Sequence, residues 1–208
     1  MKSISKSSST KILDDISAIQ EEFYSSNRKN MFFTSSQKKE CADFVNSKLS
    51  LDNLIKNTIY IVSPNLLFVD YTLLKQYAST KNYEEILNYI FYSIQKIIEE
   101  CNEYELHINF QGFSVSAVER YKELIQSFYK KFFQVNQENT NYIQHLKFLY
   151  IYNVPSMMST ITTILTKYMR ETVSQRLSIK DRMIMYSKEE SAEKLAKIYG
   201  SRIGDENV

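Results

Sequence analysis

The sequence predicts an α/β fold, in which a small, mostly parallel sheet carries helices on both faces and follows a helical N-terminal region. Short runs of β-branched and aromatic residues alternate with helical patterns from Thr58 onward, and this order is typical of βαβ units. Several of these runs are apolar on both faces, as strands buried between two layers require. Residues 11–57, in contrast, have the helical period.

The N-terminal part is predicted to place amphipathic helices before the sheet. Residues 1–10 are rich in Ser and Lys, and we expect them to form a flexible tail. In the region 11–57, apolar residues recur at helical spacing over Ile12–Phe23 and again over Ser36–Leu49. Leu51–Ile55 either extends this helical region or forms a short connector.

Five short segments after residue 57 have the composition of strands. The first is predicted to be a buried parallel strand because apolar groups lie on both of its faces, and the second is either a strand or a loop packed on the core. The third alternates, with Leu106 and Ile108 opposed to His107 and Asn109. In chain order the segments are Thr58–Ser63, Leu66–Val69, Glu105–Phe110, Lys147–Asn153 and Met183–Tyr186.

The segments between these strands have the helical period and recognisable N-caps. Asp70 is positioned to cap a short helix, and S-x-x-E capping boxes occur at Ser116 with Glu119 and at Ser187 with Glu190. The polar run 135–141 is expected to be a surface loop. The predicted helices are Tyr71–Ala78, Tyr83–Glu100, one that follows Ser116, Ser156–Met169 and a last one that ends at Gly200.

Charge and cysteine content disfavour several classes of protein. The 208 residues carry 26 basic and 24 acidic side chains, interspersed to a net charge of +2, so no nucleic-acid partner is expected. Cys41 and Cys101 lack CxxC spacing, which predicts neither a disulfide framework nor a zinc site and fits a reducing, cytoplasmic location. We find no signal peptide and no window approaching roughly 18 apolar residues, so any membrane contact is expected to be peripheral.

The sequence contains no pattern that predicts catalysis, a metal site or a cofactor. Its 3 glycines supply neither a P-loop nor a dinucleotide fingerprint. Ser114 lacks the flanking glycines of a nucleophile elbow. Some phosphotransferases carry an aspartate at a strand end and a second aspartate two residues later, but Asp70 is followed at that spacing by Thr72. His107 and His145 are interpreted as packed or surface histidines, and we expect a protein that is not an enzyme.

Three stretches of the chain resemble the CRAL-TRIO lipid-binding family, including its divergent branch. They are ELHINFQGFSVSAVERYKELIQSFYKKFF, HLKFLYIYNVPSMMSTITTILTKYM and RMIMYSKEESAEKLAKI. In that family a strand is followed by a short loop and a helix, and the next strand ends in an Asn-x-Pro turn, which here is Asn153 to Pro155. The resemblance implies a lipid domain at 58–200, the helical region 11–57 before it, and a tail at 201–208.

The resemblance also implies a binding site for one lipid or another hydrophobic small molecule. It lies between the floor of the sheet and a mobile gate helix, Ser156–Met169, whose methionines adapt to irregular apolar ligands. The chain departs from the family in lacking recognisable basic residues for a lipid headgroup. The site residues that the resemblance implies are Phe110, Phe148, Tyr150, Tyr152, Met157, Met158, Ile161 and Leu165.

A second hypothesis is a structural or protein-interaction scaffold, of cellular or viral origin, that keeps the fold and fills its pocket with aromatic side chains. An aromatic and methionine stripe at helical spacing is more often simple core than a ligand site. Under this hypothesis the partner is a protein rather than a lipid. The abundance of Ile, Asn, Lys and Tyr is typical of an AT-rich genome and does not distinguish the two hypotheses.

Overall fold

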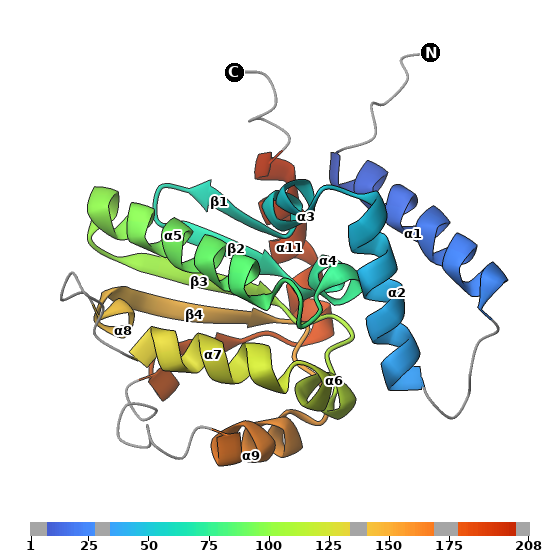
Figure 1. The fold of residues 1–208 in the computed structure, drawn as a ribbon. Helices are drawn as coiled ribbons and strands as arrows, with labels where there is room; N and C mark the ends of the chain where they lie inside the picture. The colour runs from blue at the N-terminus through green and yellow to red at the C-terminus, as the bar shows by residue number, and fades with distance from the viewer. Residues whose placement is uncertain (1–7, 28–33, 134–140, 169–178, 203–208) are drawn as a thin grey trace.

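The computed structural model describes residues 8–27, 34–133, 141–168 and 179–202, and these residues form a five-stranded sheet with the order β1-β2-β3-β4-β5 (Figure 1). Strands β2 to β5 are parallel neighbours, whereas β1 pairs with β2 antiparallel. The predicted fold class is therefore confirmed. The strands are β1 (Ile59–Ser63), β2 (Leu66–Asp70), β3 (Tyr104–Asn109), β4 (Leu146–Tyr152) and β5 (Met183–Met185).

The prediction of a buried parallel strand at Thr58–Ser63 is wrong in direction. Only Pro64 and Asn65 separate β1 from β2, and a link of two residues permits a hairpin but not the long crossover that parallel strands need. Strand β1 is thus the antiparallel edge of the sheet. It is apolar on both faces because it contacts α5 (Tyr83–Cys101) on one side and α11 (Lys188–Arg202) on the other.

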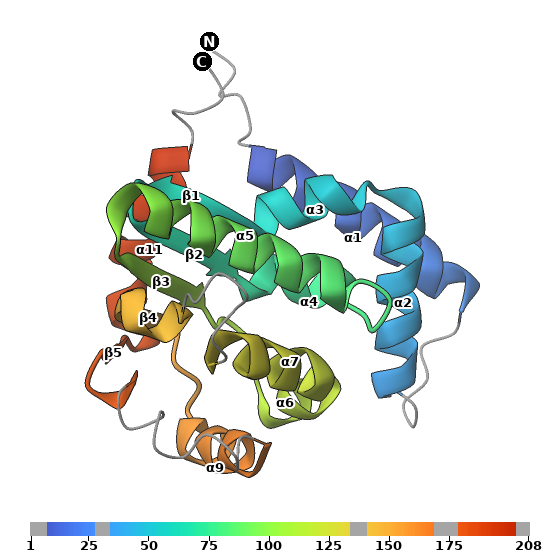
Figure 2. The ribbon, with the colours of Figure 1, turned by 60° about the vertical axis from the view of Figure 1, so that its left-hand side comes forward.

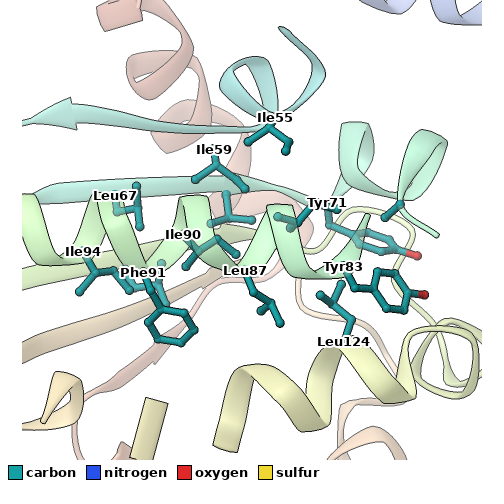
Figure 3. Close-up of a cluster of buried hydrophobic side chains, with 14 of the residues drawn as sticks. Ile55, Ile59, Leu67, Tyr71, Tyr83, Leu87, Ile90, Phe91, Ile94 and Leu124 are labelled. Carbon is teal, nitrogen blue, oxygen red and sulfur yellow. The ribbon is translucent and has the colours of Figure 1, made fainter. Parts of the chain in front are cut away.

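Helices cover the two faces of the sheet unequally. The α5 and α7 (Lys122–Phe133) helices lie over one face, and α11 lies over the other (Figures 1 and 2). Leu87 and Ile90 of α5 lie with Leu67 of the sheet in the main core (Figure 3). Further helices of this part are α4 (Tyr71–Tyr77), α6 (Val115–Arg120), α8 (Tyr142–His145) and α9 (Met158–Tyr168).

The N-terminal helices α1 (Ser8–Ser26), α2 (Thr34–Lys48) and α3 (Leu51–Thr58) share the main core of the sheet. Val45 is fully buried there, and α4 contacts both α2 and α3. The side-chain amide of Asn46 donates to the carbonyl of Tyr77 at 2.7 Å. This region therefore packs at the edge where the parallel strands end, beside α4 (Figure 1).

Two of the three predicted caps are confirmed. Asp70 caps α4 by accepting from the Thr72 N–H at 2.8 Å. The box before α11 is complete, because Ser187 N–H donates to Glu190 at 2.8 Å and Glu190 N–H donates to Ser187 at 3.3 Å. The box at Ser116 is wrong: α6 begins earlier, and its N-cap is Ser114, whose hydroxyl accepts from Ala117 N–H.

The segment Leu66–Val69, a strand or a loop by sequence, is strand β2, and α3 starts after a break at Ser50 rather than extending α2. Helix α1 already begins at Ser8, and α11 continues to Arg202. The other predicted features at 1–7, 135–140, Met169 and 203–208 lie outside the described residues.

We expect Ile94→Ala to lower the free energy of unfolding by about 2–5 kcal/mol, because it empties a fully buried position of α5. Urea unfolding followed by circular dichroism measures the loss. The control Lys96→Ala removes an exposed side chain of the same helix and should change stability by less than about 0.5 kcal/mol. Equal losses in the two variants would contradict the role of α5 in the core.

Candidate functional site

An apolar cavity of about 170 Å³ lies between the sheet and helices α5 and α7. Its floor consists of Val69 on β2 and of Leu106 and Ile108 on β3. The polar groups of its lining are tyrosine hydroxyls, and no charged side chain takes part. The rest of the lining is Tyr71, Leu74, Ile86, Leu87, Ile90, Phe110, Phe113, Tyr121, Leu124, Ile125, Phe128, Tyr129 and Leu165.

The alternation of β3 decides which side chains reach this cavity. Successive residues of a strand point to opposite faces. Leu106 and Ile108 therefore face the cavity, while His107 and Asn109 face α11. The pattern that predicts the strand thus also separates an apolar face from a face with polar groups.

Aromatic rings form one end of the cavity. Phe110 and Phe113 stack with ring centroids 4.5 Å apart. Tyr71 stands edge-on to Phe113, with centroids 5.0 Å apart, and edge-on to Tyr121 at 6.0 Å. These pairs fix the shape of this wall, because each ring is held in place by the next.

Among the described side chains of α9, Leu165 is the one that lines the cavity. The helix contacts α6 and lies beside α6 and α7 in both views rather than on the sheet (Figures 1 and 2). Ile161 is its fully buried residue, whereas Met157, just before its first turn, is 55% exposed. A helix, Met158–Tyr168, is therefore present within the predicted range Ser156–Met169 and lies at the edge of the cavity, and its role as a gate remains a prediction.

The structure divides the eight predicted site residues among several places. Phe110 and Leu165 line the cavity, and Met157, Met158 and Ile161 lie in or next to α9 without reaching it. Ligand contact by any of the eight residues remains a prediction.

The predicted floor residues of β4 lie on the face opposite to the cavity. Tyr150 and Tyr152 pack in the smaller core under α11, and Phe148, two residues earlier, shares their side of the strand. Their neighbours Leu149 and Ile151 pair with Leu106 and Ile108 and share the cavity face. The observed floor is therefore made by β2 and β3. Strand β4 is apolar or aromatic at six of its seven positions, so alternation alone could not orient it.

Residues of α5 and α7 make most of the helical wall, and sequence reasoning did not assign them to the site. Leu87 and Ile90 come from α5, and Leu124, Ile125 and Phe128 come from α7. Their helical period signals only that they face the core. Whether a cavity remains within that core depends on how the two helices pack against each other, and the helical period does not predict that packing.

A buried polar cluster joins the ends of the parallel strands on the face of α11. The Asn109 amide donates to Asp70 at 3.3 Å and to the Tyr199 hydroxyl at 3.0 Å, and its oxygen accepts from Asn153 at 2.8 Å. Tyr199 in turn donates to Asp70 at 2.7 Å. Burial first, and then the Asp70 carboxylate, raise the pKa of Tyr199 well above its ordinary value.

This cluster gives a physical role to two residues considered above. Asp70 accepts hydrogen bonds from Thr72, Asn109 and Tyr199, so its carboxylate is held by structural partners. Asn153, the first residue of the Asn-x-Pro turn, has φ 54° and ties β4 to β3 through Asn109. Asparagine is among the residues that tolerate this left-handed backbone, which explains its use at this turn.

His107 is also buried on the α11 face. Its Nδ1 is 2.8 Å from the Tyr152 hydroxyl, and its ring lies 4.3 Å from that of Tyr150. Burial lowers the pKa of His107 to about 4. The Glu105 carboxylate lies 3.4 Å from Nε2, and the burial of the ring outweighs this contact.

These side chains do not form a catalytic constellation. Ser114 caps α6, and the Nδ1 of His145 lies 2.6 Å from the carbonyl oxygen of Asn102. Within the described ranges, no group of three or more His, Cys, Asp or Glu side chains is arranged to hold a metal ion. Among the same residues, no helix is both long and apolar enough to cross a membrane.

We expect the stability of the protein to fall as the pH is lowered from about 6.5 to about 4, by up to about 3 kcal/mol from His107 alone. The unfolded ring takes up its proton near pH 6.5, whereas the folded ring resists it until about pH 4. Above the pKa of the unfolded ring the histidine is neutral in both states, so the full contribution of His107 to stability is present. Urea midpoints measured across this range test the expectation.

The variant His107→Gln should flatten that part of the pH profile, because it removes the buried ring. The matched variant His145→Gln removes the other histidine and should leave the His107 contribution in place. A profile unchanged by His107→Gln would contradict the assignment.

Comparison with known proteins identifies the family. A model of the CRAL/TRIO domain matches residues 57–200. No curated protein and no solved structure matches the chain. The match covers the sheet, α4 to α9 and most of α11, and therefore both the apolar cavity and the polar cluster. Domains of this family generally bind or transfer lipids and are generally not enzymes. With more than half of its length matched, the chain belongs to the CRAL/TRIO domain family.

Proposed function

We propose that this chain binds a lipid or another hydrophobic molecule in the apolar cavity beside α5 and α7, without catalysing a reaction. The observation that carries the proposal is the lining of the cavity, which is hydrocarbon apart from tyrosine hydroxyls. An apolar ligand loses contact with water there and leaves no charged group unpaired. In this proposal α9, whose Leu165 lines the same space, acts as the gate.

Ligand entry involves movement of α9. Pockets for drug-sized ligands measure about 300–1,000 Å³, and the cavity measures about 170 Å³. An apolar cavity of about 150 Å³ holds a molecule the size of benzene. A lipid chain therefore needs more space. Because α9 lies against α6 rather than on the sheet, its displacement enlarges the cavity and leaves the strands paired.

A gate that opens at a membrane surface would allow the protein to take up a lipid from one membrane and release it to another. Met157 before α9 is 55% exposed, and Met185 at the end of β5 is 50% exposed. These flexible apolar side chains are suited to peripheral contact with lipid. Cys41 and Cys101 are both free thiols, which supports a reducing compartment such as the cytoplasm.

The second candidate function is a scaffold that binds a protein partner. The observation in its favour is that six aromatic residues occupy the lining of the small cavity: Tyr71, Phe110, Phe113, Tyr121, Phe128 and Tyr129. If these rings fill the cavity permanently, no lipid can enter it, and the protein would act only through a surface that binds a protein partner. The two candidates differ in whether a lipid accompanies the purified protein.

Native mass spectrometry followed by organic extraction tests the proposed lipid binding. The expected result is one lipid per chain. The variant Ile125→Trp places a large ring in the cavity wall of α7. Overpacking of this kind costs about 1–3 kcal/mol, so lipid affinity should fall by about 5- to 100-fold.

The control Ser127→Trp adds the same ring to an exposed position of the same helix and should retain the lipid. Thermal unfolding checks that both variants are folded. A wild-type protein with no bound lipid, and with no uptake from vesicles, would overturn the lipid proposal. A stoichiometric protein complex in that case would favour the scaffold.

A further inference from the structure

The sheet ends at strand β5, and this strand has a neighbour on one side only. In the strand order β5 follows β4 at one border of the sheet, where Figure 2 shows it. Among the residues that the structure describes, no strand pairs with the outer side of β5. An edge strand of this kind offers its outward backbone groups to another chain.

The hydrogen bonds to β4 identify the backbone groups of β5 that point outward. The Arg182 carbonyl accepts from an N–H of β4 at 2.9 Å, and the Tyr186 N–H donates to a carbonyl of β4 at 2.9 Å. Alternate residues of a paired strand direct their N–H and C=O groups to the same side. Ile184 therefore also faces β4. The N–H and C=O groups of Met183 and Met185 point away from the sheet.

The side chains at this edge are apolar and partly open to solvent. Met185 is 50% exposed, and Met183 and Ile184 are half-buried. Strand β5 contains no charged residue and no proline, and its pairing with β4 has no bulge. Charges, prolines and bulges are the devices by which many edge strands avoid pairing with other chains. The short length of β5 limits the strength of such a pairing but does not prevent it.

The edge is complementary to a second copy of itself. Met183 and Met185 each supply one outward donor and one outward acceptor. A two-fold axis beside Ile184 places Met183 opposite Met185 of a second copy in antiparallel orientation, and the two residues of each pair then exchange both hydrogen bonds. Lipid hydrocarbon cannot satisfy these backbone groups.

The charges next to β5 are compatible with the same arrangement. In this register Asp181 lies opposite Ser187 of the second copy, and Arg182 lies opposite Tyr186. Like charges directly opposite each other would oppose strand pairing. None meet over this span.

We propose that this protein forms a symmetric dimer in which two β5 edges pair antiparallel and join the two sheets into one. The pairing covers Met185. The proposed function assigns this side chain to contact with lipid, so the dimer and that contact exclude each other at this edge. The exclusion rests on the proposed function, whereas the dimer does not depend on lipid binding.

Sedimentation equilibrium of the purified full chain tests the dimer. Few residues pair, so the dissociation constant should be roughly 10–100 μM. The expected result is a mass that rises with concentration from 24.6 kDa toward twice that value. Amide exchange followed by NMR should show protection of Met183 and Met185 at high concentration only, and of Ile184 at every concentration.

Met185→Pro removes an outward N–H that the pairing with β4 does not use, so the chain should fold while the dimer weakens about tenfold or more. Met185→Lys places a charge on the edge and should also weaken the dimer. The matched control is Met157→Lys, which makes the same change at a methionine that is 55% exposed outside β5 and should leave the dimer unchanged.

A mass that stays at 24.6 kDa at about ten times the expected dissociation constant would overturn the proposal. So would a dimer that persists in Met185→Pro, or equal weakening by Met157→Lys. Protection of Met183 and Met185 that requires phosphatidylcholine vesicles would assign the edge to lipid instead. Lipid content is measured separately, so this proposal and the proposed function fail independently.

Discussion

The side chain of Asn109 holds together the ends of three neighbouring parallel strands. It is 1% exposed and bonds Asp70 at the end of β2, Asn153 after β4 and Tyr199 on α11. Its oxygen also accepts from the Gln111 N–H at 3.1 Å, which sets the course of the chain as it leaves β3. Amide side chains can donate and accept at once, and this position needs both. The loops that leave these strands start from this fixed edge.

The sheet separates two kinds of interior. One face offers hydrocarbon to α5 and α7, and there a small void persists between well-packed helices. The other face combines tyrosine rings with the buried His107 and a connected set of hydrogen bonds. Such a polar network is satisfied only in one arrangement, so it specifies the position of α11. Hydrogen bonds therefore hold the α11 side, whereas apolar packing holds the side of α5 and α7.

Much of the architecture could be predicted from local sequence. The period of α5, the alternation of β3 and the cap at Asp70 depend on nearby residues, and the structure has all three. The direction of β1 was missed because Leu66–Val69 was left open as a strand or a loop, and the two-residue link implies a hairpin only once that segment is a strand. The orientation of β4 was missed because Phe148 and Leu149 are both apolar, so either face was compatible with the core.

The N-terminal helices have a consequence for how the protein is divided. The family match begins at residue 57, but Ile12, Ile16 and Val45 belong to the same buried cluster as the sheet. A fragment cut at that boundary would expose the apolar surface that these residues cover and would leave α4 without its neighbours. The segment that matches the family model is therefore smaller than the segment that shares one buried core.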